Sequence, residues 1–301
     1  MYNFNQQIIM VTGAGRGSGR AYALALAARG ATVIAIDNGG DLMGTGHNPQ
    51  CIQSVVDTAQ ELAGSILGYC VDVTNAQAVA EVIEITIARF ERIDGLICNA
   101  GILALQQSVG AELSLYRKQM ETNFFAQIQC IQQVLPYLQR QQRGRIVLTS
   151  GISTLYGDPQ LMGYAASNAA IIGFLRSFSL QLTNSNITAN LIIPAHHSRL
   201  SGLFDTPYDM ENMTADRVTP AVLWLLSEQA PNGAMVPAGG NYYSLITANE
   251  TEGVMLAPSE CRPQIVAKAL GRLMPMVTKQ KFSHFSERTS QILRRLRSEH
   301  C

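Results

Sequence analysis

The stretch that most constrains the fold is residues 8–37, with the sequence IIMVTGAGRGSGRAYALALAARGATVIAID. It begins with an apolar run of strand length, continues with four alternate glycines, and then shows apolar residues at helical spacing. Gly30 ends the predicted helix, and a second β-rich apolar run closes on the acid Asp37. Strand, glycine loop, helix and strand in this order predict the first part of a nucleotide-binding βαβ unit.

The residue types in this unit suit a dinucleotide. Glycine lets the backbone approach a pyrophosphate, and the free N–H groups at the helix start, together with the helix dipole, favour an anion. Asp37 stands where such folds present a carboxylate to the hydroxyls of the adenosine ribose. The unit therefore predicts a pocket for a dinucleotide.

Composition excludes several other classes of protein. The 301 residues are 47% hydrophobic, which is ample for a core in one or two domains, and the formal net charge is zero. A balanced charge argues against nucleic acid or a membrane surface as the main partner. The polar start MYNFNQQ and the lack of an apolar run near the ~20 residues of a membrane helix predict a cytoplasmic protein. The six cysteines lack metal spacing, so no metal site is expected.

Apolar strands and helical segments alternate along the rest of the chain without a low-complexity linker, which is typical of a doubly wound parallel sheet. The further predicted strands are residues 65–71, 95–98, 144–150 and 187–193, and the further predicted helices are residues 51–62, 75–90, 112–138 and 164–182. We therefore predict a single-domain α/β fold of the Rossmann type with about seven strands. Residues 1–250 would form the dinucleotide-binding and catalytic domain, and residues 251–301 a helical extension of it.

Several motifs at the ends of predicted strands carry a family resemblance: Thr12-Gly13-x-x-x-Gly17-x-Gly19, Asp72-Val73 and Asn99-Ala100-Gly101. Together with the strand and helix order, they resemble the short-chain dehydrogenase/reductase (SDR) family. Four further segments, IDNGGDLMGTG, PAHHSRLSG, VTPAVLWLLSE and AGGNY, resemble more narrowly the branch that contains the (3R)-hydroxyacyl-CoA dehydrogenases. The similarity covers about four fifths of the chain, roughly residues 6–245.

The resemblance implies a cofactor site made of these residues: Gly13, Arg16, Gly17, Ser18, Gly19, Asp37, Asp72, Val73, Asn99, Ala100, Gly101, Tyr164, Asn168, Pro194 and Ser198. Arg16 is a basic residue of the kind that contacts a 2′-phosphate in relatives that prefer NADP. Asp37 repels a phosphate but accepts hydrogen bonds from ribose hydroxyls, so we expect NAD(H). Ser198 matches the hydroxyl that contacts the nicotinamide carboxamide in the family.

The catalytic segment departs from the family pattern. SDR members carry a serine thirteen residues before a Tyr-x-x-x-Lys, whereas here Gly151 precedes Tyr164 at that spacing and Asn168 replaces the lysine. Ser150 lies one place early, so it should face away from the substrate unless the strand end twists or bulges. Asn123 falls where the family places a structural and catalytic asparagine. The candidate catalytic residues are Tyr164, Asn123, Ser150 and Asn168.

The two substitutions have chemical consequences. Without the lysine ammonium, only a small fraction of the Tyr164 phenol ionises near neutrality, because a free phenol has a pKa of about 10. Losing the serine as a hydrogen-bond donor to the developing alkoxide commonly costs on the order of 10² to 10³ in rate. We expect Gly151 to leave space for a bulkier substrate group or a water. Asn168 can still hydrogen-bond a ribose hydroxyl, so the site can bind a nucleotide even where it no longer transfers a proton.

Three functions remain open. The chain could be an NAD(H)-dependent oxidoreductase acting on a carbonyl or alcohol of a small molecule, an SDR scaffold that performs a redox-neutral isomerisation, dehydration or cyclisation, or a non-catalytic homologue. His47, His196 and His197 could supply acid–base function near neutrality, although surface-loop histidines are the simpler interpretation. The resemblance also implies a homodimer or homotetramer built on helices 112–138 and 164–182.

Overall fold

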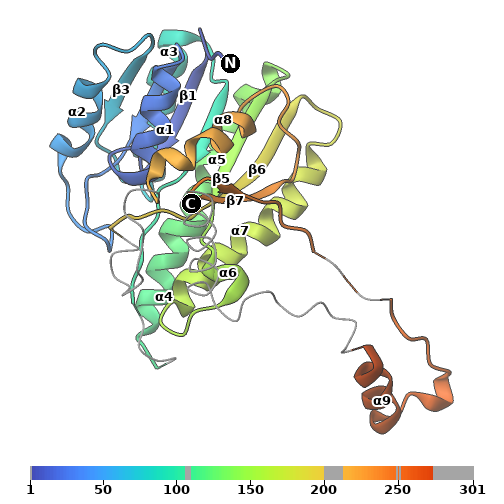
Figure 1. The fold of residues 1–301 in the computed structure, drawn as a ribbon. Helices are drawn as coiled ribbons and strands as arrows, with labels where there is room; N and C mark the ends of the chain where they lie inside the picture. Colours follow the sequence, from blue (N-terminus) through green and yellow to red (C-terminus); the bar gives the residue numbers. More distant parts are fainter. Residues whose placement is uncertain (1, 106–109, 200–212, 249, 251, 274–301) are drawn as a thin grey trace, which may run out of the picture.

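The centre of the computed structural model is one eight-stranded sheet with the order β3-β2-β1-β4-β5-β6-β7-β8 (Figure 1). The structure describes residues 2–105, 110–199, 213–248, 250 and 252–273. The strands are β1 Ile8–Thr12, β2 Thr32–Ile36, β3 Ser65–Tyr69, β4 Gly95–Cys98, β5 Gly144–Thr149, β6 Ile187–Pro194, β7 Met235–Gly239 and β8 Tyr242–Tyr243. Strands β1 to β7 pair in parallel, and only the short β8 is antiparallel, to β7. The prediction of a Rossmann-type parallel sheet is confirmed.

Helices lie on both faces of this sheet, at the ends of its strands and, in the last described part of the chain, apart from it. They are α1 Gly17–Ala27, α2 Pro49–Thr58, α3 Ala76–Phe90, α4 Leu113–Met120, α5 Ala126–Arg140, α6 Ser153–Tyr156, α7 Met162–Gln181, α8 Thr219–Leu225 and α9 Pro263–Leu273, with the short helices η1 Glu121–Phe125, η3 Ala215–Arg217 and η4 Pro258–Glu260. The core under α3, α5 and α7 takes Ile8 and Met10 of β1, whereas Ile9 and Val11 pack under α1 and α8. Successive strand side chains point to opposite faces, so a strand covered on both faces is a continuous apolar run.

The strand order reverses between β1 and β4, and this reversal positions the functional site. β1 pairs with β2 on one side, Thr12 opposite Ile36, and with β4 on the other, Val11 opposite Ile97. The loops that follow β1 and β4 therefore both begin at the carboxyl ends of the strands, and the chain then continues to β2 on one side and to β5 on the other. In open α/β sheets this edge is where ligands bind.

The predicted helix over residues 112–138 is interrupted in the structure. It consists of α4, one π-helical turn, η1, and α5, which extends to Arg140 with Pro136 inside it. A π turn inserts one extra residue into a helix and is frequent at functional sites. The hydrophobic spacing of the sequence does not distinguish it from a regular α-helix, and here it carries Asn123.

The end of the chain is described only in part. Of the predicted helical extension, the structure describes residue 252 to residue 273, which include η4 and α9, and residues 274–301 lie outside the described residues. Helix α9 stands apart from the sheet in Figure 1, and Ala269 is its only buried residue. Within the described ranges, no helix combines the length and apolar content that a membrane crossing requires.

Candidate nucleotide and substrate site

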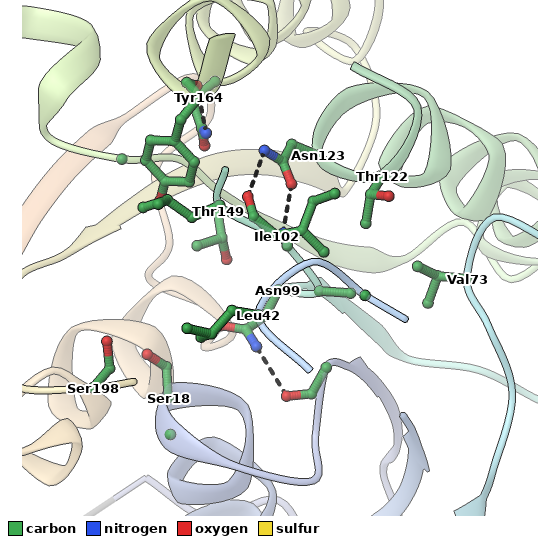
Figure 2. Close-up of a pocket in the computed structure, with 18 of the residues that line it drawn as sticks. Ser18, Leu42, Val73, Asn99, Ile102, Thr122, Asn123, Thr149, Tyr164 and Ser198 are labelled. Atoms are coloured by element: carbon green, nitrogen blue, oxygen red, sulfur yellow. Dashed lines mark hydrogen bonds between the residues drawn. The ribbon is translucent and has the colours of Figure 1, made fainter. Parts of the chain in front are cut away.

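A cavity of about 610 Å³ opens at the carboxyl ends of β1, β2, β4, β5 and β6 (Figure 2). It extends from Asp37, directly after β2, to Tyr164 on the first turn of α7. With the exception of Gly19, every residue predicted for the cofactor or catalytic site lines it. The topology thus brings into one cavity residues that lie up to 185 positions apart, from Gly13 to Ser198.

The glycine loop fits closely between its neighbours. Gly13 and Gly17 have φ of +64° and +53°, which side chains rarely adopt. A Cβ on Gly13 would lie 2.7 Å from Cα of Ala100, and one on Gly19 would lie 2.1 Å from the carbonyl oxygen of Gly13. Gly19 therefore serves the packing of α1 against the loop and does not face the cavity. No side chain caps the N-terminus of α1, so its N–H groups are available to an anion.

Asp37 joins the glycine loop to the loop after β2. Its Oδ2 accepts a hydrogen bond from the N–H of Gly15 at 2.8 Å, and its Oδ1 accepts one from the N–H of Gly39 at 2.7 Å. Each carboxylate oxygen can accept more than one hydrogen bond, so Asp37 can also accept hydrogen bonds from ribose hydroxyls. The carboxylate is thus fixed in position beside the glycine loop. We call this end of the cavity, formed by the glycine loop and Asp37, the nucleotide end.

Asn99 fixes the loop after β4 to the loop after β1. Its Nδ2 donates to the carbonyl oxygens of Thr12 and Gly13, both at 3.2 Å, and its backbone N–H donates to Oγ1 of Thr12 at 3.0 Å (Figure 2). Asp72 is held in a similar way, because its Oδ1 accepts from both the N–H and the hydroxyl of Thr74. Hydrogen bonds from side chains to the backbone of the loops therefore organise the nucleotide end of the cavity.

Tyr164 lies directly against the backbone of Gly151. A Cβ on Gly151 would be 2.5 Å from Cε1 and 2.9 Å from Oη of Tyr164. The expectation that Gly151 leaves room for a substrate group or a water is wrong, because the tyrosine ring occupies that space. Desolvation raises the pKa of Tyr164 to about 12, so its phenol is protonated near neutrality.

Asn168 and Ser150 both turn toward the backbone of α7. Nδ2 of Asn168 donates to the carbonyl oxygen of Tyr164 at 2.9 Å, one helical turn earlier. Oγ of Ser150 donates to the carbonyl oxygen of Asn168 at 3.1 Å, and Ser150 is buried. The Ser150 hydroxyl thus points to the backbone of α7, which agrees with the expected strand alternation.

Asn123 uses its whole amide to hold the loop after β4 (Figure 2). Its Nδ2 donates to the carbonyl oxygen of Ile102 and to Oγ of Ser167, each at 3.0 Å, while its Oδ1 accepts from the N–H of Ile102 at 2.8 Å. The π turn η1 thus directs a buried amide at both the β4 loop and α7. The geometry gives Asn123 a positioning role.

The three candidate histidines, His47, His196 and His197, lie in different places. His196 lines the cavity, and its Nε2 is hydrogen-bonded to Oγ of Ser18, while its Nδ1 donates to the carbonyl oxygen of His197 at 2.8 Å. Nε2 is then the acceptor of the Ser18 hydroxyl, and burial lowers the pKa of His196. His47 is exposed beside Cys70, and neither it nor His197 lines the cavity. No cluster of three potential metal ligands occurs in the part of the chain that the structure describes.

The sequence did not predict that the loop between β2 and α2, residues 37–48, forms a wall of the cavity at the end where Tyr164 lies. We call this end the substrate end. The carbonyl oxygen of Leu42 accepts from the N–H of Leu103 at 3.1 Å, and Nζ of Lys118 donates to Oγ1 of Thr45 at 3.0 Å. This β2–α2 loop therefore begins beside the nucleotide end and reaches α4 at the other. Its Gly- and Asn-rich composition indicates a loop but not its partners.

The model of the short chain dehydrogenase family matches residues 7–200 of the sequence. The chain belongs to the short-chain dehydrogenase family. Peroxisomal multifunctional enzyme type 2 of Mus musculus is 30% identical over 261 residues, which cover 84% of this chain and 34% of that protein. The enzyme of the same name from Drosophila melanogaster is 29% identical over 257 residues, 85% of this chain and 42% of that protein. This short-chain dehydrogenase thus spans less than half of these relatives.

Solved structures share the fold over most of the chain. A short chain dehydrogenase from Mycobacterium avium superposes with a TM-score of 0.75 and 25% identity, covering 90% of this chain and 96% of its own. Carveol dehydrogenase from the same organism, solved in complex with NAD, gives a TM-score of 0.71 at 22% identity, covering 79% of this chain and 97% of its own. The second similarity shows the fold alone.

Proposed function

We propose that this short-chain dehydrogenase is an NAD(H)-binding oxidoreductase that acts on a carbonyl or alcohol of a small molecule through a non-standard active site, in which Tyr164 supplies the proton. The observation that carries the proposal is the single cavity of about 610 Å³ that joins Asp37 and the glycine loop to Tyr164. The resemblance to the (3R)-hydroxyacyl-CoA dehydrogenase branch favours an acyl-chain carbonyl as the substrate.

The residues present fit a dinucleotide. Gly13 and Gly17 line the cavity without a side chain, the N-terminus of α1 lacks a side-chain cap, and the Asp37 carboxylate is held by the N–H of Gly15. The bound nicotinamide would supply or accept the hydride. All of the following line the cavity: Pro194 and Ser198 would contact the nicotinamide, Asp72 and Val73 the adenine, and Asn99 to Gly101 the part of the cofactor between them.

Tyr164 favours reduction over oxidation in this site. A phenol with a pKa of about 12 is a proton donor at neutral pH and is rarely available as a base. In reduction it would give its proton to the substrate oxygen as negative charge develops there. Among the described residues, no cationic side chain bonds to Tyr164, and no hydroxyl stands at position 151, so the reaction lacks two groups that the family uses.

A second candidate, a redox-neutral reaction or a non-catalytic role, is favoured by one contact. The Tyr164 ring is packed onto Gly151, so a serine side chain would fit there only if the ring shifted. A scaffold that keeps its nucleotide for structure would tolerate this arrangement.

The test is a titration with NADH and NADPH followed by turnover of 3-oxoacyl thioesters. We expect tighter binding of NADH, relaxed in Asp37→Ala, and slow reduction that falls roughly 10²-fold or more in Tyr164→Phe with the NADH affinity unchanged. Tighter binding of NADPH would contradict the cofactor assignment. Turnover of a substrate with no net change in NADH would select the redox-neutral alternative.

We further propose a cytoplasmic homodimer or homotetramer that uses α4, η1, α5 and α7, with residues 251–301 as an extension of the same domain. Phe125 of η1 is 50% exposed and Leu180 of α7 is 74% exposed, so these helices carry apolar side chains that a second copy of the chain could cover. Light scattering at the mass of one chain would contradict the oligomer.

A further inference from the structure

Four aliphatic hydroxyl groups lie within three residues of Gly151, and they fall into two pairs. Ser150 and Thr154 use theirs on backbone: Oγ of Ser150 donates to a carbonyl oxygen of α7, and Oγ1 of Thr154 donates to that of Gly151 at 2.8 Å. Oγ of Ser153 and Oγ1 of Thr149 are buried and have no hydrogen-bond partner among the described residues. Both Ser153 and Thr149 line the cavity.

A buried hydroxyl without a partner costs free energy, because it has lost its hydrogen bonds to water and gained none in the protein. Such groups are rare in folded proteins. Where the hydroxyl belongs to a residue in the wall of a cavity, a bound ligand can supply the missing partner. The two unpartnered hydroxyls are therefore candidate contacts for a ligand of this cavity.

Thr149, at the end of β5, shares the face of the sheet that α1 covers. Successive residues of a strand alternate between the two faces. Leu148 packs in the core under α3, α5 and α7, whereas Val147 packs under α1 and α8, so Thr149 points to the same side as Val147. Figure 2 shows the Thr149 side chain in the view between Tyr164 and Asn99. Thr149 thus faces the side on which the glycine loop leads into α1.

Ser153 lies at the substrate end, beside the apolar side chains that pack around Tyr164. Its neighbour Ile152 and the tyrosine ring both pack against the buried pair Leu103 and Leu161. Ser153 itself is 3% exposed. A hydrogen bond is electrostatically stronger in such surroundings than in water. A polar group of the substrate that reaches Ser153 would therefore form its hydrogen bond away from water.

The turn that carries Ser153 is held by hydrogen bonds on both sides of it. The N–H and the hydroxyl of Thr154 both donate to the carbonyl oxygen of Gly151, at 3.1 and 2.8 Å. The N–H of Gly157 donates to the carbonyl oxygen of Ser153 at 2.8 Å. Gly151 is also the residue against which the Tyr164 ring lies. The backbone of Ser153 is therefore fixed two residues from the point where Tyr164 contacts the chain.

We propose that the Ser153 hydroxyl donates a hydrogen bond to the substrate oxygen that receives the Tyr164 proton, a role that the glycine at position 151 cannot fill. The inference rests on the proposed function and adds a catalytic residue to it. Ser153 keeps its own proton, so Tyr164 remains the group that transfers one. The hydrogen bond strengthens as negative charge develops on the substrate oxygen. Thr149 is not assigned this role, because its side chain points to the α1 side of the sheet.

The first test compares turnover. Reduction of a 3-oxoacyl thioester by NADH should fall about 10²-fold in Ser153→Ala, mainly in kcat, because a donor to developing charge contributes on this scale. The affinity for NADH should not change. Thr149→Val removes the other unpartnered hydroxyl at nearly constant volume and should change kcat less than about threefold. A 10²-fold loss in Thr149→Val with none in Ser153→Ala would overturn the assignment.

Thermal unfolding gives a readout that a structural role would not share. Removing an unpartnered buried hydroxyl relieves its desolvation, so Ser153→Ala should have the Tm of the wild type or a higher one. Ser150→Ala is the matched control, because it removes a buried hydroxyl that has a partner, and its Tm should be lower. A Tm of Ser153→Ala as low as that of Ser150→Ala would contradict the inference.

Binding of substrate analogues tests the same hydrogen bond without turnover. With NADH bound, the wild type should bind a 3-hydroxyacyl thioester about tenfold more tightly than the saturated acyl thioester of the same length. Ser153→Ala should lose most of this difference, and Thr149→Val should keep it. Calorimetry on the full chain measures both affinities.

The outcomes separate the inference from the proposed function. Reduction by the wild type with an unchanged kcat in Ser153→Ala would overturn the role of Ser153 and leave the proposed function standing. A wild type that distinguishes the two thioesters through Ser153 but reduces no 3-oxoacyl thioester would keep the hydrogen bond and overturn the proposed reaction. A wild type that does neither would overturn both.

Discussion

The two ends of the cavity depend on different parts of their residues, the backbone at one end and side-chain functional groups at the other. At the nucleotide end, Gly13, Gly19, Asp37 and Asn99 act on backbone, either by leaving room for it or by holding it with hydrogen bonds. At the end where Tyr164 lies, the family chemistry depends on the functional groups of individual side chains. By the resemblance to the family, Gly151 and Asn168 stand where two of those groups are expected, whereas the motifs of the nucleotide end match the family pattern.

The difference follows from what each substitution does to the fold. A side chain at Gly19 would collide with the carbonyl group of Gly13, so that position cannot change without moving α1. A serine or a lysine that serves chemistry alone can change at little cost in folding free energy. Binding and catalysis can therefore be lost separately in this fold, and the following predictions test that separation.

The largest effect is expected from Gly19→Ala. Its Cβ would lie 2.1 Å from the oxygen of Gly13, so we expect nucleotide affinity to fall by more than 100-fold and unfolding free energy by about 3 kcal/mol. Gly173→Ala on α7 is the control, since a Cβ there meets no atom within 4 Å, and it should stabilise by about 0.5–1 kcal/mol. Thermal unfolding and NADH titration measure both, and normal binding by Gly19→Ala would contradict the steric argument.

The alkaline stability of the fold should depend on Tyr164. The unfolded chain releases this proton near its ordinary pKa of 10.0, and the folded chain holds it until about 12. The stability contribution is therefore fully present below pH 10 and is lost as the pH rises toward 12, with an amplitude of about 2–3 kcal/mol. Denaturant unfolding of Tyr164→Phe should show a flatter decline, measured against wild type because burial also raises the pKa of Tyr22. Identical declines would argue against a desolvated phenol.

Restoring the family residues should not restore the family activity. In Gly151→Ser with Asn168→Lys, the serine Cβ meets the Tyr164 ring, so we expect a loss of about 1–3 kcal/mol in stability and less than a tenfold gain in carbonyl reduction. Steady-state assays and chemical unfolding measure the two. A gain well above tenfold would mean that the ring moves aside and that the site is a lapsed reductase.

The smallest effect is expected from Ser150→Ala. The Ser150 hydroxyl donates to a carbonyl oxygen of α7, so its removal should cost about 1 kcal/mol in stability and less than about threefold in any turnover. Gln127→Ala is a useful comparison, because its Nε2 bonds the carbonyl oxygen of the preceding residue, Thr149. A loss of activity near 10²-fold in Ser150→Ala would instead make Ser150 the replacement for the missing serine.

The sequence predicted most of the fold because every central strand is buried on both faces and is therefore an apolar run of the right length. The segments at residues 95–98 and 144–150 became β4 and β5 almost without change. The π turn was not predictable, since one extra residue in a long amphipathic helix hardly alters its hydrophobic spacing. The positions of the motif residues followed from parallel strands, whose carboxyl ends share one edge.

The arrangement within the cavity was only partly predictable. Strand alternation placed Ser150 correctly, because it depends on local geometry. The position of the Tyr164 ring over Gly151 depends on how α7 packs against the end of β5, which residue identities do not specify. The hydrogen bond from Arg199 to the carbonyl oxygen of Gly40 was not predictable, because it joins two loops that are 159 residues apart in the sequence.

The β2–α2 loop has a consequence for redesigning or exchanging parts of this protein. Its first residues hold Asp37, and its later residues form hydrogen bonds with Leu103 and Lys118 at the far end of the cavity. A loop transplanted from a relative to change the preferred coenzyme would also reshape the wall that faces the other reactant. We therefore expect coenzyme preference and the range of accepted reactants to change together in this chain, and directed evolution of one should be screened for changes in the other.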